Sequence, residues 1–72
     1  MATVASIQAA LDTQGTNKKL LILKQQPKST GATTDSFYVL GGTVYAGRAR
    51  WVSTTNTDTA AQQATSITNA MA

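Results

Sequence analysis

The sequence predicts a small α+β domain over residues 1–72, in which an N-terminal helix, a three-stranded antiparallel sheet and a C-terminal helix follow one another. Apolar residues recur at helical spacing near both ends of the chain, whereas the central part alternates as strands do. Gly and Pro residues separate these segments. A chain of 72 residues has room for one small core, so we expect a single domain.

Residues 3–13 have the pattern of a short amphipathic helix. Thr3 is placed to cap its start and Gly15 to end it. Gln8 and Asp12 are expected to face away from the core. The apolar stripe consists of Val4, Ile7 and Leu11.

Residues 18–26, KKLLILKQQ, predict a buried strand, because the apolar run is too short for an ordinary helix and Pro27 ends it. Residues 27–35 are expected to form a loop that reaches toward a partner. In the strand, alternation directs Leu20 and Ile22 to one face and Leu21 and Leu23 to the other.

The remaining two strands are predicted at 36–40 and 43–52, joined by the pair Gly41-Gly42. Two β-rich runs separated by two glycines are typical of a hairpin with a two-residue turn. In that register Leu40 lies opposite Thr43, and apolar side chains fall on both faces of the hairpin. One face contains Tyr38, Leu40, Tyr45 and Trp51. The other contains Phe37, Val39, Val44, Ala46, Arg48 and Arg50.

Two short helices cannot cover both faces of this sheet. We therefore expect the face opposite the tyrosines to meet another chain. The predicted partner interface consists of Phe37, Val39, Val44, Arg48 and Arg50.

A polar connector over residues 53–60 leads to the predicted C-terminal helix, with Asp58 or Thr59 as its cap. The apolar stripe of this helix is built mostly of small side chains, which bury little area each. It consists of Ala60, Ala64, Ile67 and Met71.

The composition argues against catalysis. The chain has no His, Cys or Glu, which removes most acids, bases and nucleophiles as well as disulfides and zinc sites. Asp12, Asp35 and Asp58 are too scattered to bind a cation and are expected to cap helices or support turns. We therefore expect a non-enzymatic protein without metal or cofactor.

Association is the stabilising route that this composition leaves open. Only 12% of the residues are charged, about half of the roughly 25% of ordinary domains. The neutral polar surface can be buried without desolvating many ions, and the net charge of +3 favours acidic partners. No apolar run is long enough to cross a membrane.

A second set of residues has the chemistry of nucleic-acid contacts, since aromatic rings stack on bases and cations bind phosphates. The set consists of Lys18, Lys19, Lys24, Tyr45, Arg48, Arg50 and Trp51. The same residues also suit a protein interface, or a core with a solvated face. Strand alternation puts Arg48 and Arg50 on the face opposite Trp51, which favours these two interpretations over a stacking platform.

In its overall character the chain resembles small structural proteins of tailed-bacteriophage virions, above all capsid decoration or cement proteins. The shared features are heavy use of Ala and Thr, few charges and the absence of Cys and His. The resemblance implies a multicopy subunit, made in the host cytoplasm, that binds the major capsid protein on the virion and reinforces the shell. The alternative is a small basic nucleic-acid-binding module.

Overall fold

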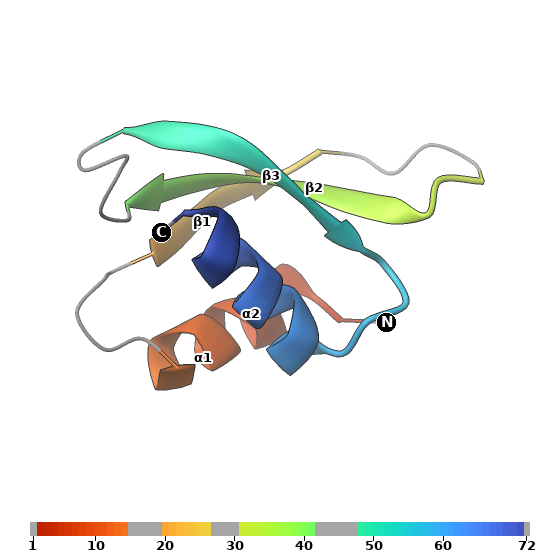
Figure 1. The fold of residues 1–72 in the computed structure, drawn as a ribbon, viewed down its shortest axis with the longest axis horizontal. Coiled ribbons are helices and arrows are strands. Elements are labelled where there is room, and N and C mark those ends of the chain that lie inside the picture. Colours follow the sequence, from red (N-terminus) through yellow and green to blue (C-terminus); the bar gives the residue numbers. More distant parts are fainter. Residues whose placement is uncertain (1, 15–19, 27–30, 42–47, 72) are drawn as a thin grey trace.

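The computed structural model describes residues 2–14, 20–26, 31–41 and 48–71. It has the predicted α+β order of helix, three strands and helix (Figure 1). The elements are α1 (Val4–Gln14), β1 (Leu20–Gln25), β2 (Thr34–Gly41), β3 (Ala49–Thr55) and α2 (Ala60–Ala70). Both helices lie on the same side of the sheet, so the fold has two layers and no described helix covers the other sheet face (Figure 1).

The sheet is antiparallel with the order β1-β2-β3, which places β2 in the centre. Phe37 of β2 lies opposite Val52 of β3, and Val39 lies opposite Ile22 of β1. These side chains belong to the covered face, where Phe37 and Val39 are fully buried. Directly opposite residues share a face, so the register aligns apolar rows over the helices.

Both helices contribute the apolar stripes that their spacing predicts. Ile7 and Leu11 of α1 are buried, and Val4 packs against the core. Ala64 and Ile67 of α2 are buried, as is the following Met71, and Ala60 packs beside them. Small side chains on α2 allow a close approach of the helix to the sheet, and the core remains small.

The predicted helix starts are confirmed. The Ser6 amide donates to the Thr3 hydroxyl at 3.1 Å, which satisfies a free amide in the first turn of α1. At the start of α2, Thr59 rather than Asp58 is the cap. Its hydroxyl accepts from the Gln62 amide at 3.2 Å, and the Gln62 side chain accepts from the Thr59 amide at 2.9 Å. This reciprocal pair is a capping box.

The predicted turn at Gly41-Gly42 is wrong, although β2 and β3 are indeed antiparallel neighbours. Leu40 lies opposite Ala49 instead of Thr43, and Gly41 belongs to β2, where it lies opposite Leu20 of β1. Residues 42–47, which contain the remainder of the expected turn and the start of the expected strand, lie outside the described residues. The third strand accordingly extends to Thr55, three residues into the expected connector.

Candidate interaction surface

The uncovered side of the sheet presents a mixed apolar and cationic surface, which we call the open face. It consists of Leu21, Leu23, Lys24, Tyr38, Leu40 and Trp51. Three of its large apolar side chains are well exposed: Leu21 at 50%, Leu23 at 47% and Trp51 at 42%. Isolated exposed leucines are ordinary, but a group of large apolar side chains on one face is a feature of interaction sites.

An irregularity in β1 puts Lys24 at the centre of this surface. Ile22 lies opposite Val39, and Lys24, rather than Leu23, lies opposite the next residue, Tyr38. Leu23 is therefore an extra residue of the kind that defines a β-bulge. If residues 22–24 were all paired in a regular strand, strict alternation would turn Lys24 toward the helices, so the bulge places this cation on the open face.

Lys24 is held above two aromatic rings. Tyr38 and Trp51 lie directly opposite each other on β2 and β3, with ring centroids 5.1 Å apart and planes tilted by 44°. The Lys24 Nζ is 5.8 Å from the Tyr38 centroid and 5.6 Å from that of Trp51. At an exposed site such a cation–π contact contributes about 0.5–1 kcal/mol. Within the described part of the chain, no carboxylate forms an ion pair with Lys24.

Hydroxyl groups border the aromatic pair toward the start of β2 and the end of β3. The Ser36 and Ser53 hydroxyls share a hydrogen bond of 3.0 Å, and Thr34 lies opposite Thr55 in the strand pairing. The uncovered side of the sheet thus combines the open face, which is apolar around one cation, with a neutral polar border of hydroxyl groups. Neither part requires the removal of water from many ions when a partner covers it.

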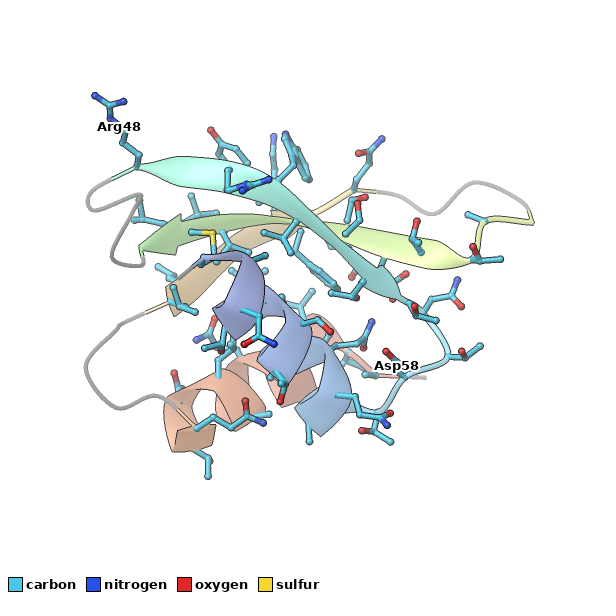
Figure 2. All side chains as sticks on the ribbon, viewed as in Figure 1. Arg48 and Asp58 are labelled. Carbon is cyan, nitrogen blue, oxygen red and sulfur yellow. The ribbon has the colours of Figure 1, made fainter. Side chains whose placement is uncertain are left out.

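Charges are divided between the two layers. The described cations, Lys24, Arg48 and Arg50, lie in or beside the strands, with Arg50 on the helix-covered face, and Figure 2 shows Arg48 extending away from the helices. The sequences of α1 and α2 contain no Lys or Arg. Asp12 lies on α1 and Asp58 shortly before α2. Among the described residues, the outer surface of the helix layer is therefore anionic relative to the open face.

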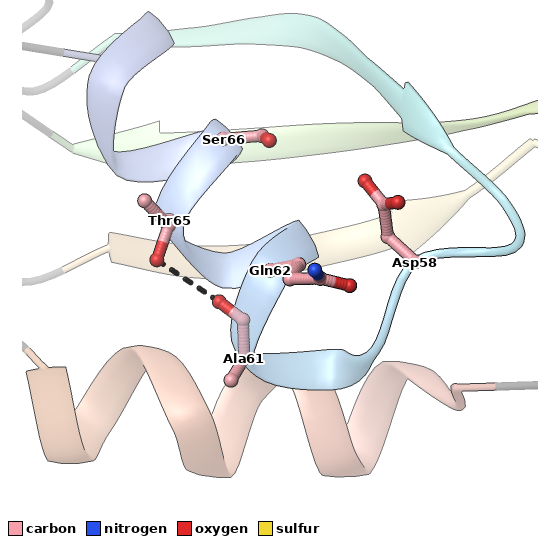
Figure 3. Close-up of a pocket in the computed structure, with 5 residues that line it drawn as sticks. All are labelled: Asp58, Ala61, Gln62, Thr65 and Ser66. Carbon is pink, nitrogen blue, oxygen red and sulfur yellow. Dashed lines mark hydrogen bonds between the residues drawn. The ribbon is translucent and has the colours of Figure 1, made fainter.

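A shallow hollow of about 360 Å³ lies on the outer side of α2. It is lined by Asp58, Ala61, Gln62, Thr65 and Ser66, and Asp58 stands across it from Gln62 and Ser66 (Figure 3). The Thr65 hydroxyl donates to the Ala61 carbonyl at 3.0 Å, whereas the Asp58 carboxylate has no hydrogen bond to the described residues. The hollow thus offers short side chains beside a carboxylate that no described residue engages.

A polar cluster that no pattern in the sequence predicts is buried between the two layers. The Gln63 Nε2 donates to Asp35 Oδ2 at 3.1 Å and to Thr54 Oγ1 at 2.8 Å. Asp35 and Thr54 lie opposite each other on β2 and β3, so the expected turn role of Asp35 is wrong. The Gln63 Oε1 is buried without a partner among the described residues. The cluster is enclosed, and its one carboxylate faces an amide rather than a second acid or a base. Its hydrogen bonds therefore orient α2 on the sheet.

Gln8 also has a role that differs from the prediction that it faces away. Its Oε1 accepts from the Ile22 amide at 2.9 Å, and its Nε2 donates to the Leu20 carbonyl at 2.9 Å. Gln8 therefore occupies the outer edge of β1, where an unpaired strand would otherwise present these groups to another strand. No spacing rule for helices identifies a side chain that bonds to a strand more than ten residues away.

The structure contradicts the predicted partner interface at two positions. Phe37 and Val39 are fully buried under the helices and cannot meet a partner in the folded chain. Arg50 lies opposite Val39 in the register and is exposed, as is Arg48. Val44 lies outside the described residues. The predicted interface was wrong here because it placed the helices on the side of the sheet that contains Tyr38 and Trp51.

Of the alternative nucleic-acid set, Lys24 and Trp51 come together on the open face. Arg50 belongs to the opposite side of the sheet. Lys18, Lys19 and Tyr45 lie outside the described residues. Tyr38, Leu21 and Leu23 were not nominated as site residues, although their alternation with buried neighbours was visible in the sequence.

Two further findings concern the described residues only. They contain no group of three acidic, His or Cys side chains that could hold a metal ion. None of their helices has the length and apolar character needed to cross a membrane. A search for relatives among protein families, curated proteins and solved structures finds no match to this chain.

Proposed function

We propose that this chain is a non-enzymatic structural subunit that uses its open face to bind another protein within a multicopy assembly. The observation that carries this proposal is the uncovered sheet face, on which Leu21, Leu23 and Trp51 are exposed around Lys24. Following the resemblance to decoration proteins, the assembly is a bacteriophage virion whose shell is built of the major capsid protein. The subunit is made in the host cytoplasm and adds contacts that lock the shell.

The chemistry of the open face suits a protein partner. Trp and Tyr are enriched at the centres of protein interfaces because each buries a large area at small cost in conformational entropy. Tyr38 and Trp51 provide such a centre, and the Ser36–Ser53 row provides a polar border. Burial of this surface removes few ions from water, which favours a permanent contact over a transient one.

The positions of the acidic side chains support a role without catalysis. Asp35 is buried against Gln63, and Asp12 accepts from the Gln8 Nε2 at 3.0 Å. Asp58 lies beside short neutral side chains, with no second titratable group among the described residues that line the same hollow. General acid or base chemistry requires a tuned group directed at a substrate, and none of the three carboxylates has such a setting.

Binding of single-stranded nucleic acid is the second candidate. One specific observation favours it, namely that Lys24 shares the open face with Tyr38 and Trp51, so that a cation and two rings lie together on an uncovered sheet. Against it, Lys24 lies over the rings on which bases would stack, and Leu21 and Leu23 beside them offer nothing to phosphates. The protein partner therefore ranks first.

The test compares tagged wild-type chain with the Trp51→Ser variant and with Ala9→Ser, a control on the exposed side of α1. The partner that co-purifies with wild type is identified, purified and rebound at low salt and at about 1 M salt, where the Debye length is about 3 Å. We expect wild type and Ala9→Ser to retain the partner at both salt concentrations and Trp51→Ser to lose it.

Oligothymidylate is the probe for the second candidate. Tight binding that weakens steeply with the logarithm of the salt concentration, in a chain that retains no protein partner, would overturn the structural proposal. If the Trp51→Ser variant kept the protein partner, the open face would not be part of the contact.

A further inference from the structure

We propose that copies of this chain associate head to tail, with the open face of one molecule on the outer side of α2 of the next. In this contact Lys24 and Trp51 of one copy meet Asp58 of its neighbour. The inference rests on the proposed function, because it names a second copy of the chain as the occupant of the same open face.

Charge complementarity selects the second copy and its orientation. The open face carries Lys24, which has no ion pair with the described residues, and it carries no carboxylate among them. The outer side of α2 carries Asp58 and no cation in its described part. Two open faces placed against each other would bring two lysines together, whereas an open face on α2 brings opposite charges together.

The open face and the outer side of α2 also differ in shape. Trp51 is a large side chain that is 42% exposed on the sheet, while the hollow on α2 is lined by short side chains and holds about 360 Å³. Ala61, Thr65 and Ser66 leave room for a protruding ring to approach the helix. An indole N–H and a lysine ammonium are both donors, and the Asp58 carboxylate accepts from donors of either kind.

The Asp58 carboxylate is available to a neighbouring molecule because it makes no hydrogen bond to the described residues. Thr59 caps α2, and Asp58 contributes only its backbone amide, which donates to the Thr55 carbonyl at 3.1 Å. Asp12 differs in this respect, since it already accepts from Gln8. The two carboxylates of the helix layer are therefore distinguishable by substitution.

A contact between two unlike surfaces leaves the pair with one free surface of each kind, the open face on one molecule and the outer side of α2 on the other. Such heterologous contacts close into rings when the rotation between copies allows it and otherwise continue as filaments. The proposed contact therefore builds multicopy rings or filaments from one type of chain. Pairing of two identical faces would end at a dimer.

The test is a charge exchange followed by sedimentation velocity. Lys24→Glu and Asp58→Lys are each prepared alone and in a 1:1 mixture, at concentrations up to about 1 mM. Each variant alone places like charges in every contact, so we expect it to remain monomeric where wild type associates. In the mixture, contacts between the two introduced side chains alternate with contacts between the native Lys24 and the native Asp58. Every interface then joins opposite charges, so we expect wild-type association to return.

Asp12→Lys is the matched control, because it makes the same change of charge on the other helix. It should associate as wild type does, and unchanged circular dichroism and urea midpoints show that all variants fold. Monomeric wild type up to about 1 mM, or a mixture that fails to associate, overturns the head-to-tail contact. Loss of association by Asp12→Lys equal to that by Asp58→Lys overturns the assignment to Asp58.

Failure of this contact is distinguishable from failure of the proposed function. If wild type is monomeric and Trp51→Ser still loses a co-purified protein, the open face binds a different chain and only the head-to-tail contact is wrong. If Trp51→Ser keeps its partner, the open face has no role in binding.

Discussion

The side chain of Gln63 donates to Asp35 Oδ2 at 3.1 Å across the interface between α2 and the sheet, and both residues are buried. The same Nε2 donates to Thr54 Oγ1 at 2.8 Å, so one amide fixes α2 to two strands. Buried polar contacts of this kind specify one packing arrangement among several that an apolar core of small residues allows.

Replacement of Gln63 by Ala should therefore be costly. It removes both hydrogen bonds, leaves a buried carboxylate without its donor and opens a cavity, for which we expect a loss of about 3 kcal/mol in the free energy of unfolding. Urea denaturation measures it, with exposed Asn69→Ala on the same helix as the control. A loss equal to that of the control would mean that the cluster does not hold α2 on the sheet.

Gln8→Ala should weaken the outer edge of β1. The substitution leaves the Ile22 amide and the Leu20 carbonyl without their partner, at a cost of about 1–2 kcal/mol in the free energy of unfolding. Hydrogen exchange of the Ile22 amide should accelerate more than that of amides in β2. Thr13→Ala, which removes only a bond within α1, is the control, and equal exchange rates at Ile22 in both variants would contradict the role of Gln8.

Substitutions on the two faces of the sheet should have unequal costs. Phe37→Ala empties a fully buried position and should lower the free energy of unfolding by about 3–5 kcal/mol. Trp51→Ala removes a partly exposed ring and should cost about 1 kcal/mol or less. The urea midpoints of the two variants measure which substitution costs more. The reverse order of costs would mean that the helices cover the opposite face.

Deletion of Leu23 should be tolerated, because it converts the bulge into a regular strand and leaves Lys24 on the open face. We expect a change of about 1 kcal/mol or less in stability and a retained nuclear Overhauser contact between Lys24 and the Trp51 ring. Deletion of Leu21 is the comparison. It draws Leu20 out of the core and should cost about 2–4 kcal/mol. Equal losses for the two deletions would contradict the bulge.

The helices were predictable because their periodicity is local. The spacing of Ile7 and Leu11, and of Ala64, Ile67 and Met71, defines each buried stripe without knowledge of what it contacts. The strand faces were predictable in the same way. Tyr38 and Trp51 were expected on one face and Phe37 and Val39 on the other, and this grouping holds although the register differs.

The covered face was not predictable from the hairpin alone. Its identity depends on the end of β3, where Val52 extends the apolar face and Ser53 and Thr55 extend the open face with hydroxyls. The expected strand ends at Val52, because the polar composition of residues 53–60 indicates a connector, and it therefore leaves out Ser53 and Thr55. The bulge at Leu23 was invisible for another reason, since LLILKQ reads equally well as a regular strand and only its pairing with β2 exposes the extra residue.

The open face is the surface that we propose binds the partner of this chain. Trp51 is the only tryptophan in the sequence and lies on that face, so its fluorescence reports the contact directly. The decisive measurement is acrylamide quenching of Trp51 in the isolated chain and in the assembled state. We expect easy quenching in the isolated chain, and protection with a shift of the emission to shorter wavelength on assembly. Equal quenching in both states would contradict this role of the open face.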